Sequence, residues 1–441
     1  MFESYSNINA IGLIFTITMG LLILVLPRRF AAFPMIMTAC YITLGQFLVV
    51  SALNFSMFRI IIFFGLARII FRKELFELNL HMIDKILIAY VIVSATAYLL
   101  LRNGSNEAVV SQLGFAYNTL GLYFLFRALI RDTEDIHRTF KVLALVMAPL
   151  AIAMLLEKAT GRNLFSVFGG VPEFTMVRDG KLRCQGAFSH PILAGTFGAT
   201  SLPFFLALWF GEKKDRPVAA LGILSSVIIT VTPSSSGPAV AFIFAIIGAS
   251  MWAIRDHMRA VRWGILLALV SLHIVMKASV WALIGRISEI IGGTGWHRVM
   301  LIDAAIDHFN EWWLLGTDYT RHWMPTGVTW SEKHTDITNQ FIHEGIQGGI
   351  FSLLLFVTII VLCYRGIGKM LKETAQIEPK STFMIWCLGA SLTAHIASFT
   401  SVRYFDQMIV FWYLLLSMIS SGVNFFSNIV PNDRKISNPV P

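Results

Sequence analysis

Long apolar blocks alternate with short charged segments along almost the whole chain. Each block is continuous over roughly 17 to 22 residues, the length that a helix needs to cross about 30 Å of hydrocarbon. Within a block, apolar and polar residues do not alternate, so the pattern predicts membrane-spanning helices and not a β-barrel. We therefore predict an all-α protein, a polytopic transmembrane helical bundle of about 12 to 13 spans.

The boundaries of the apolar blocks define the predicted spans. The third span is short and contains Arg59 and Arg68, which must extend toward the interface or face a polar interior. Because the spans are distributed along the whole chain, residues 1–441 are predicted to form one integral membrane domain that contains all of these spans. They are 9–26, 31–52, 55–71, 83–101, 109–130, 140–156, 191–211, 217–232, 239–254, 263–283, 348–368, 382–400 and 404–423.

The basic residues divide the connections between spans into two sets. Basic clusters fall on every second connection, so the positive-inside rule predicts that these connections are cytoplasmic, with the N-terminus outside and the tail inside. The net charge of +9 is thus explained by topology, and no nucleic-acid partner is predicted, because no basic stripe forms. The clusters are Arg28/Arg29, Arg72/Lys73, Arg131/Arg138, Lys213/Lys214/Arg216, Arg255/Arg259/Arg262 and Lys369/Lys372/Lys380.

Two connections on the predicted outer side are long, namely 157–190 and 284–347. The other outer connections are short, so function is expected in these two loops. In the larger loop, apolar residues recur at helical spacing from Trp296 to Phe309, which predicts an amphipathic helix at the outer interface. Farther along, Gly345, Gly348 and Gly349 are expected to let the next helix pack closely.

Composition narrows the class of protein further. Hydrophobic residues make up 56% of the chain and charged residues only 14%, which excludes an ordinary soluble domain. The four cysteines have no CxxC spacing and three lie in apolar segments, so neither a disulfide framework nor a zinc site is indicated. The first apolar block lacks a preceding charged segment and a cleavage site, so it is interpreted as a retained helix.

The two outer loops contain candidate chemistry. Loop 157–190 carries Arg178, Lys181 and Arg183, and loop 284–347 carries Arg298 and Arg321 with several histidines and aspartates. Arginine binds phosphate in two-point contacts, and a near-neutral histidine can move a proton, so the mixture suits an anionic, membrane-bound substrate.

Other chemistries are less favoured by the sequence. The serines of "TPSSSGPAV" (232–240) have no base nearby in sequence, and a tight turn between two helices accounts for the segment. There is no HExxH, and the loop histidines follow no regular ligand spacing, so no metal site and no cofactor are predicted. These histidines are His297, His308, His322, His334 and His343.

Three segments together resemble the O-antigen ligase and polymerase superfamily of bacterial surface-polysaccharide enzymes. Arg183 followed by "QGAFSHPILAG" is similar to the family's Arg-x-x-Gly-x-Phe-x-x-Pro entry to a membrane helix. The segment "GWHRVMLIDAAIDHFNEWWLLGT" resembles the family's Arg-bearing helix and Leu-Gly turn. In "KHTDITNQFIHEGIQGG", His334 and Thr335, nine residues, Gly345, two residues and Gly348 keep the spacing of the ligases' His motif. The resemblance covers roughly the central and C-terminal two thirds of the chain.

The resemblance implies a function and roles for residues. It implies a bacterial inner-membrane enzyme that transfers glycans from polyprenyl diphosphate at a periplasmic site without a metal. Arg183 and Arg298 would hold the diphosphate, and His334 would be the general base on the acceptor. Asp336 would orient His334 or cap the next helix. Arg178, Lys181, Arg321, Asp336 and Asn339 are the further candidates for substrate binding.

Several alternatives stay open from the sequence. A polymerase of repeat units is preferred to a ligase acting on lipid A-core, because the amide after His334 and a Ser-Arg element are missing. A second register would place Thr338 and Asn339 at the catalytic position. A transporter or lipid-linked sugar flippase is the alternative of another class. Expected partners are the lipid-linked glycan, a glycan or lipid acceptor and membrane lipids, and the resemblance allows a chain-length regulator as well.

Overall fold

A computed structural model of the chain describes residues 8–43, 45–50, 53–74, 79–290, 295–377 and 381–436. Within these residues, eight helical stretches are long and apolar enough to cross a membrane, and each predicted apolar segment contains one helix. The predicted fold class, an all-α polytopic bundle, is confirmed. The helices that precede the second long loop are α1 (Ala10–Val25), α2 (Arg28–Tyr41), α3 (Met57–Arg72), α4 (Met82–Leu101), α5 (Asn106–Leu129), α6 (Thr133–Thr160), α7 (Pro191–Phe210), α8 (Arg216–Val231), α9 (Ser236–Ser250) and α10 (Met258–Val275).

The second long loop and the segments after it contain the remaining helices. These are α11 (Ala282–Ile290), α12 (Trp296–Asp307), α13 (Phe309–Trp312), α14 (Gln340–Ile377), α15 (Thr382–Phe399) and α16 (Gln407–Ile436). The short 3-10 helices are η1 (Leu164–Phe168), η2 (Lys213–Asp215), η3 (Met251–His257) and η4 (Arg321–Trp323). The strands are β1 (Phe47–Val50), β2 (Leu53–Ser56), β3 (Val177–Arg178) and β4 (Lys181–Leu182).

The predicted span 31–52 is wrong in its second half. Helix α2 ends at Tyr41, and the chain then forms β1, which pairs antiparallel with β2. The segment is rich in valine and aromatic residues, and a short apolar run of this kind fits a strand as well as a helix. The predicted end of the span 263–283 is also too late, because α10 ends at Val275.

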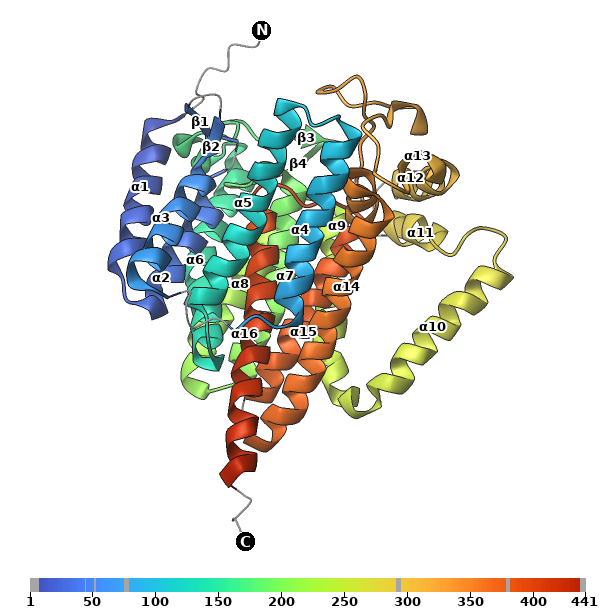
Figure 1. Ribbon diagram of the computed structural model, residues 1–441. Helices are drawn as coiled ribbons and strands as arrows, with labels where there is room; N and C mark the ends of the chain where they lie inside the picture. The colour runs from blue at the N-terminus through green and yellow to red at the C-terminus, as the bar shows by residue number, and fades with distance from the viewer. Residues whose placement is uncertain are drawn as a thin grey trace.

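The connections of the bundle lie at two ends (Figure 1). The two long connections, 161–190 and 276–339, lie at the same end, which is called the loop end below. The predicted basic clusters lie at the opposite end, called the basic end, except that Lys380 lies outside the described residues. The predicted grouping of the connections is confirmed. That the loop end faces the periplasm is a prediction from the positive-inside rule.

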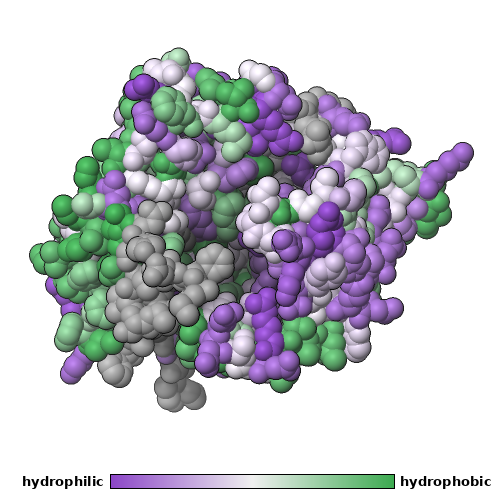
Figure 2. Space-filling model, turned by 90° about the horizontal axis from the view of Figure 1, so that it is seen from above, coloured by the Kyte–Doolittle hydropathy of each residue, from purple (hydrophilic) through white to green (hydrophobic). Residues whose placement is uncertain are grey.

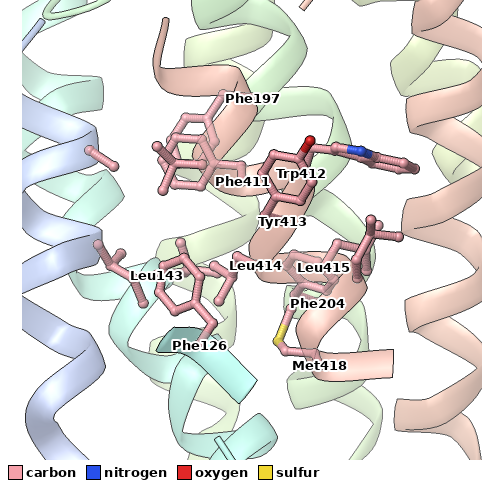
Figure 3. Packing of buried hydrophobic residues seen from close by; sticks show 14 of the residues in the cluster. Phe126, Leu143, Phe197, Phe204, Phe411, Trp412, Tyr413, Leu414, Leu415 and Met418 are labelled. Carbon is pink, nitrogen blue, oxygen red and sulfur yellow. The ribbon is translucent and has the colours of Figure 1, made fainter. Parts of the chain in front are cut away.

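Aromatic packing around α7 and α16 forms the centre of the bundle (Figure 3). The rings of Phe197 and Phe411 stack with their centroids 4.1 Å apart, and those of Phe140 and Phe204 are 4.5 Å apart. Beside this core, α7 and α8 approach closely at Gly198, where a Cβ would lie 2.9 Å from a backbone oxygen of α8. Small residues at such contacts are typical of membrane helix packing.

The long second loop forms a separate layer over the loop end. Helix α12 lies within the predicted helical segment and buries Val299, Leu301, Ala304 and Ala305, so the predicted helix is confirmed. Its apolar residues Met300 and Ile306 are exposed, and its position at the outer interface stays a prediction. Figure 2, seen from above, shows hydrophilic residues gathered on the side of this loop and hydrophobic residues along the opposite rim. The loop therefore gives the bundle a polar surface at one end.

Candidate functional site

A turn after α6 holds the segment that contains Arg183. Glu157, in the last turn of α6, accepts the backbone N–H of Gly186 at 2.9 Å. On the other side of Arg183, the carbonyl of Leu182 accepts a hydrogen bond from Lys158 Nζ at 2.7 Å. Both flanks of Arg183 are thus tied to the same helix end, which fixes its backbone at the loop end.

Arg183 is one of three arginines that are buried in the described part of the chain. The other two lie toward the basic end and are paired with carboxylates, Arg68 with Glu74 at 2.8 Å and Arg127 with Asp84 at 3.3 Å. Arg183 has no such carboxylate among the described residues, and its Nε is buried without a hydrogen-bond partner. Burying an unpaired cation is costly, so its guanidinium is well suited to bind an anion.

His190 lies beside Arg183, and Phe405 connects it to a further arginine, Arg403. It caps the N-terminus of α7. Burial, together with the positive charges of Arg183 and Arg178, lowers the pKa of His190 to about 4. The ring of Phe405 contacts both His190 and Arg403, with its centroid 6.5 Å from the His190 ring and 5.8 Å from Arg403 Cζ. The loop of Arg183 and the α15–α16 connection therefore meet at Phe405.

Arg403 stands in the middle of the short connection between α15 and α16. Its neighbour Tyr404 is anchored, because the Tyr404 N–H donates to Gln340 Oε1 at 2.6 Å. Burial lowers the pKa of Arg403, and the carboxylate of Asp336 opposes this effect. No described residue forms a hydrogen bond or ion pair with the guanidinium, whose Cζ lies 5.8 Å from the centroid of the Phe405 ring.

Arg298 reaches the start of α9 from helix α12. Its Nη1 donates to Ser288 Oγ at 3.2 Å, and this oxygen lies 3.3 Å from Ser236 Oγ. At Gly237 a Cβ would lie 3.7 Å from Arg298 Nη2 and 2.9 Å from Ser401 Oγ. The guanidinium therefore lies close to the α15–α16 connection.

A salt bridge between Arg298 and Asp303 is the structural alternative for this arginine. Instead, Asp303 Oδ1 accepts a hydrogen bond from Trp281 Nε1 at 2.7 Å. Burial lowers the pKa of Arg298, and no carboxylate opposes that effect. Like Arg183, Arg298 therefore has hydrogen-bonding capacity that the described protein groups do not use.

The turn between α8 and α9 joins the two loops that contain these arginines. Ser234 Oγ donates to the carbonyl of Leu182 at 3.3 Å, next to Arg183, while Ser236 contacts the serine beside Arg298. Ser234 has a φ of 50°, as expected in a tight turn. The interpretation of this serine-rich segment as a turn is confirmed, and its hydroxyls serve as connectors.

His334 has basic neighbours other than the two predicted arginines. Burial lowers the pKa of its imidazole, and the positive charges of Arg102 and Arg403 add to this effect. Among the described residues it forms no hydrogen bond with Arg183 or Arg298. The predicted base thus lies near Arg102 and Arg403 and is not hydrogen-bonded to either of the two predicted arginines.

Asp336 connects the second loop to the start of α12. Its backbone carbonyl accepts a hydrogen bond from His297 Nε2 at 3.1 Å, one residue before Arg298. Its carboxylate is exposed, acts on Arg403 and forms no recorded hydrogen bond with His334. The expected roles of Asp336, orienting His334 or capping the next helix, are therefore not its roles in this geometry.

Asn339 is the residue that caps α14. Its Oδ1 accepts the backbone N–H of Ile342 at 3.2 Å, and its side chain is buried. The amide oxygen is thus used by the helix, which argues against Asn339 as a substrate-binding group. The register in which Thr338 and Asn339 occupy the catalytic position stays a prediction, since the hydroxyl oxygen of Thr338 is buried without a hydrogen-bond partner among the described residues.

The glycines after this cap form a kink that receives the end of the second loop. Gly349 has a φ of 71° and a ψ of −172°, a region that glycine alone adopts readily. The kink frees the N–H of Ile350, which donates to the carbonyl of Trp313 at 2.8 Å. On the loop, Gly316 is equally constrained, because a Cβ would lie 2.1 Å from the carbonyl oxygen of Ile346. Two of the resembling segments are therefore docked together.

The expected close packing at the other motif glycines is confirmed. At Gly345 a Cβ would lie 2.5 Å from the ring of Trp312, and at Gly348 it would lie 3.1 Å from the Cα of Ser94 in α4. Any side chain at either position requires α14 to move away from its neighbours.

Three predicted substrate-binding cations are either exposed on a hairpin or bonded to backbone carbonyls. Arg178 and Lys181 face each other across the β3–β4 hairpin, and both are exposed. Arg321 donates to the carbonyls of Met324 and Pro325 at 2.9 and 3.3 Å, so it holds its own loop together. The structure brings these three residues into no direct contact with Arg183, Arg298 or His334.

A cavity of about 210 Å³, lined by both polar and apolar side chains, lies between α4, α5, α14 and α16, next to the α15–α16 connection. Glu344 is buried at its wall and accepts hydrogen bonds from Tyr90 Oη at 2.6 Å and Gln340 Nε2 at 2.7 Å. Gln340 also holds the backbone beside Arg403. An ionisable group at membrane depth is typical of functional positions.

One cluster in the described part of the chain has the side chains that a metal ion would need. Ligand atoms of His308, Glu311 and His322 all lie within 4.8 Å of one another in the second loop. None of the predicted site residues belongs to this cluster.

Sequence reasoning missed Arg102, His190 and Arg403. Arg102 and Arg403 lie in short connections at the loop end, whereas most basic clusters lie at the other end. An arginine that departs from the charge bias is a signal that the sequence offers. His190 stands inside the first resembling segment, where only the helix entry was considered.

No family model matches this chain, and no curated protein matches it either. The function is therefore inferred from the site geometry and from the resemblance of its three segments.

Proposed function

We propose that the protein is a membrane glycosyltransferase that polymerises polyprenyl-diphosphate-linked repeat units into an exopolysaccharide or O-antigen at the loop end. One observation carries this proposal. Arg183, Arg298 and Arg403 come from three different segments. Arg183 is buried, the other two are half-buried, and none of the three forms an ion pair with a carboxylate among the described residues. They gather at one end of a membrane bundle, where a lipid diphosphate headgroup would lie.

Helix direction adds to the positive potential of this site. Helices α7, α9, α14 and α16 all begin at the loop end, so their N-termini, which have partial positive charge, face the same region. The α15–α16 connection contains Arg403, and its Ser401 lies close to Gly237, the residue that Arg298 also approaches. A diphosphate is the substrate group that best matches three guanidinium groups.

The proposed reaction needs a positioned hydroxyl and a stabilised leaving group. The acceptor hydroxyl attacks the sugar C1, a new C–O bond forms, and the bond between C1 and the diphosphate oxygen breaks. His334 accepts the hydroxyl proton, and its lowered pKa keeps the imidazole neutral and ready as a base near pH 7. The three arginines stabilise the negative charge on the departing polyprenyl diphosphate.

The test uses purified protein in lipid nanodiscs with a polyprenyl-diphosphate oligosaccharide. Polymer length and released polyprenyl diphosphate are measured for the wild type and for Arg183→Lys, Arg298→Lys and Arg403→Lys. Lysine keeps the charge but loses the two-point contact, so each variant should be slower by roughly 10-fold to 1,000-fold. Arg162→Lys is the matched control, because Arg162 is exposed and pairs with Glu173 at the loop surface. Full activity in all three variants would reject the proposal.

The acceptor separates a polymerase from a ligase. With lipid-linked repeat units alone, a polymerase forms longer lipid-linked chains, whereas a ligase forms product only when lipid A-core is supplied. The cavity with Glu344 is the observation that favours the third alternative, a transporter of lipid-linked sugars. Transfer of a fluorescent lipid-linked sugar across a vesicle membrane, without formation of a glycosidic bond, would support that alternative.

A further inference from the structure

The second loop holds a cluster of two histidines and one glutamate that the proposed reaction does not use. His308 and Glu311 are three residues apart at the start of α13, and His322 comes from η4. His308 Nδ1 lies 2.8 Å and His322 Nε2 lies 2.9 Å from the same carboxylate oxygen, Glu311 Oε1. Three potential metal ligands therefore converge on one point.

We infer that His308, Glu311 and His322 form a zinc-binding site. Two imidazoles and one carboxylate are a ligand set that zinc prefers, and imidazole disfavours calcium and magnesium. In a tetrahedral zinc site, neighbouring ligand atoms lie about 3.3 Å apart. The two histidine nitrogens lie 2.8 and 2.9 Å from Glu311 Oε1, and all three ligand atoms lie within 4.8 Å of one another, so a shift of these side chains brings them to that spacing. The side chains are 31 to 38% exposed, which leaves room for this shift and for a water as fourth ligand.

The groups around the cluster hold the ligands in orientation. Trp323 Nε1 donates to the other carboxylate oxygen, Glu311 Oε2, at 3.0 Å. The Trp323 ring also stacks on the His308 ring at an interplanar angle of 5°, and Tyr319 stacks on His322 at 12°. Hydrogen bonding to a metal-binding carboxylate and fixed ring planes are features of preformed metal sites.

A bound zinc ion would join two parts of the loop that are far apart in sequence. The residues next to η4 are bonded to the segment before His334, because Thr320 N–H donates to the carbonyl of Lys333 at 2.9 Å. In return, Thr335 N–H donates to Thr320 Oγ1 at 3.2 Å. The metal would thus stabilise the loop that positions His334, as a structural ion outside the reaction itself.

The sequence predicted no metal site because the histidines of the second loop follow no regular ligand spacing along the chain. The ligands come from α13 and from a separate 3-10 turn, and only the folded loop brings them together. This site is independent of the proposed glycosyl transfer, so its test does not rely on activity.

The experiment uses the full-length protein without a polyhistidine tag, stripped of metal with a chelator. Zinc is added, excess is removed by gel filtration, and bound zinc per chain is measured by mass spectrometry. The wild type should retain one more equivalent of zinc than Glu311→Gln or His322→Ala. His273→Ala, which removes an exposed loop-end histidine outside the cluster, should bind like the wild type.

Two further measurements keep the inference testable if a ligand variant folds poorly. Trp323→Phe leaves all three ligands in place but removes the indole N–H, so zinc affinity should fall roughly 10-fold to 100-fold. Zinc should also slow hydrogen exchange at the backbone amides of Thr320 and Thr335 in the wild type. Equal zinc content in wild type, Glu311→Gln and His322→Ala, or no zinc on the wild type, overturns the inference.

Discussion

Replacing Arg183 by methionine separates a substrate-binding arginine from a structural one. In the folded protein its Nε is buried without a partner, and leaving a buried polar group unsatisfied costs about 1–3 kcal/mol. Methionine fills similar space without that cost. The folded state of Arg183→Met should therefore be as stable as the wild type, or more stable by about 1–3 kcal/mol.

Arg127→Met is the internal comparison. Arg127 is as buried as Arg183, but its Nη2 and Nε each lie 3.3 Å from an oxygen of the buried Asp84. Removing Arg127 leaves the buried Asp84 carboxylate without its ion pair to this arginine, although Tyr123 and Ser420 still donate hydrogen bonds to it. Breaking a buried ion pair costs about 3–5 kcal/mol. The two substitutions are chemically identical, but only the one at Arg127 should lower stability.

The assay follows thermal unfolding in detergent by tryptophan fluorescence and glycan polymerisation in the same preparations. Arg183→Met should keep or raise the unfolding temperature while activity falls roughly 100-fold to 1,000-fold, the range for losing one preorganised donor. Arg127→Met should lower the unfolding temperature, with activity following the folded fraction. If Arg183→Met lowers the unfolding temperature as far as Arg127→Met does, Arg183 is structural and the diphosphate site loses its first residue.

Three further predictions address the kink, the base and the central arginine. Gly349→Ala should destabilise docking of the second loop by about 1–3 kcal/mol, because φ is 71° and a Cβ would lie 2.1 Å from the carbonyl oxygen of Leu314. Limited proteolysis of that loop should therefore become faster. Gly368→Ala is the control, because no neighbouring atom of the described residues lies within 4 Å of a Cβ at that position. The acid limb of the pH–rate profile should lie below the usual histidine pKa of about 6.5, because burial lowers the pKa of His334 and the base stays neutral to lower pH; an acid limb above pH 6.5 would contradict this assignment. Arg403→Lys should raise the KM for the lipid-linked donor or lower kcat without changing the unfolding temperature, and a lower unfolding temperature would instead indicate a structural role.

The candidate site could be predicted in part because some of its signals are local. Arg183 and Arg298 stand in loops whose sidedness follows from charge, and neither forms an ion pair with a carboxylate among the described residues. Arg403 was missed, since its surroundings include Asp336, which comes from a different segment of the chain. Its departure from the charge bias was nevertheless visible in the sequence.

Local sequence patterns do not show when the polar atoms of a side chain are already hydrogen-bonded to the backbone. Asn339 was expected to bind substrate, but its amide oxygen caps α14. Arg321 was expected to do the same, but its guanidinium is bonded to carbonyls of its own loop. Whether a polar group is available to a ligand depends on which backbone groups fold beside it, and spacing along the chain does not contain that information.

The sequence by itself determined that the chain is a helical membrane bundle, where most of its spans lie and which connections share an end. These features follow from the length of apolar runs and from charge bias, which are properties of single segments in a bilayer. Only the tertiary structure decided that part of the block 31–52 is a hairpin, and that Gly316 and Gly349 dock the second loop onto α14. The same holds for the ligand atoms of His308, Glu311 and His322. Such contacts join residues from separate segments, so packing and backbone hydrogen bonding between those segments select them.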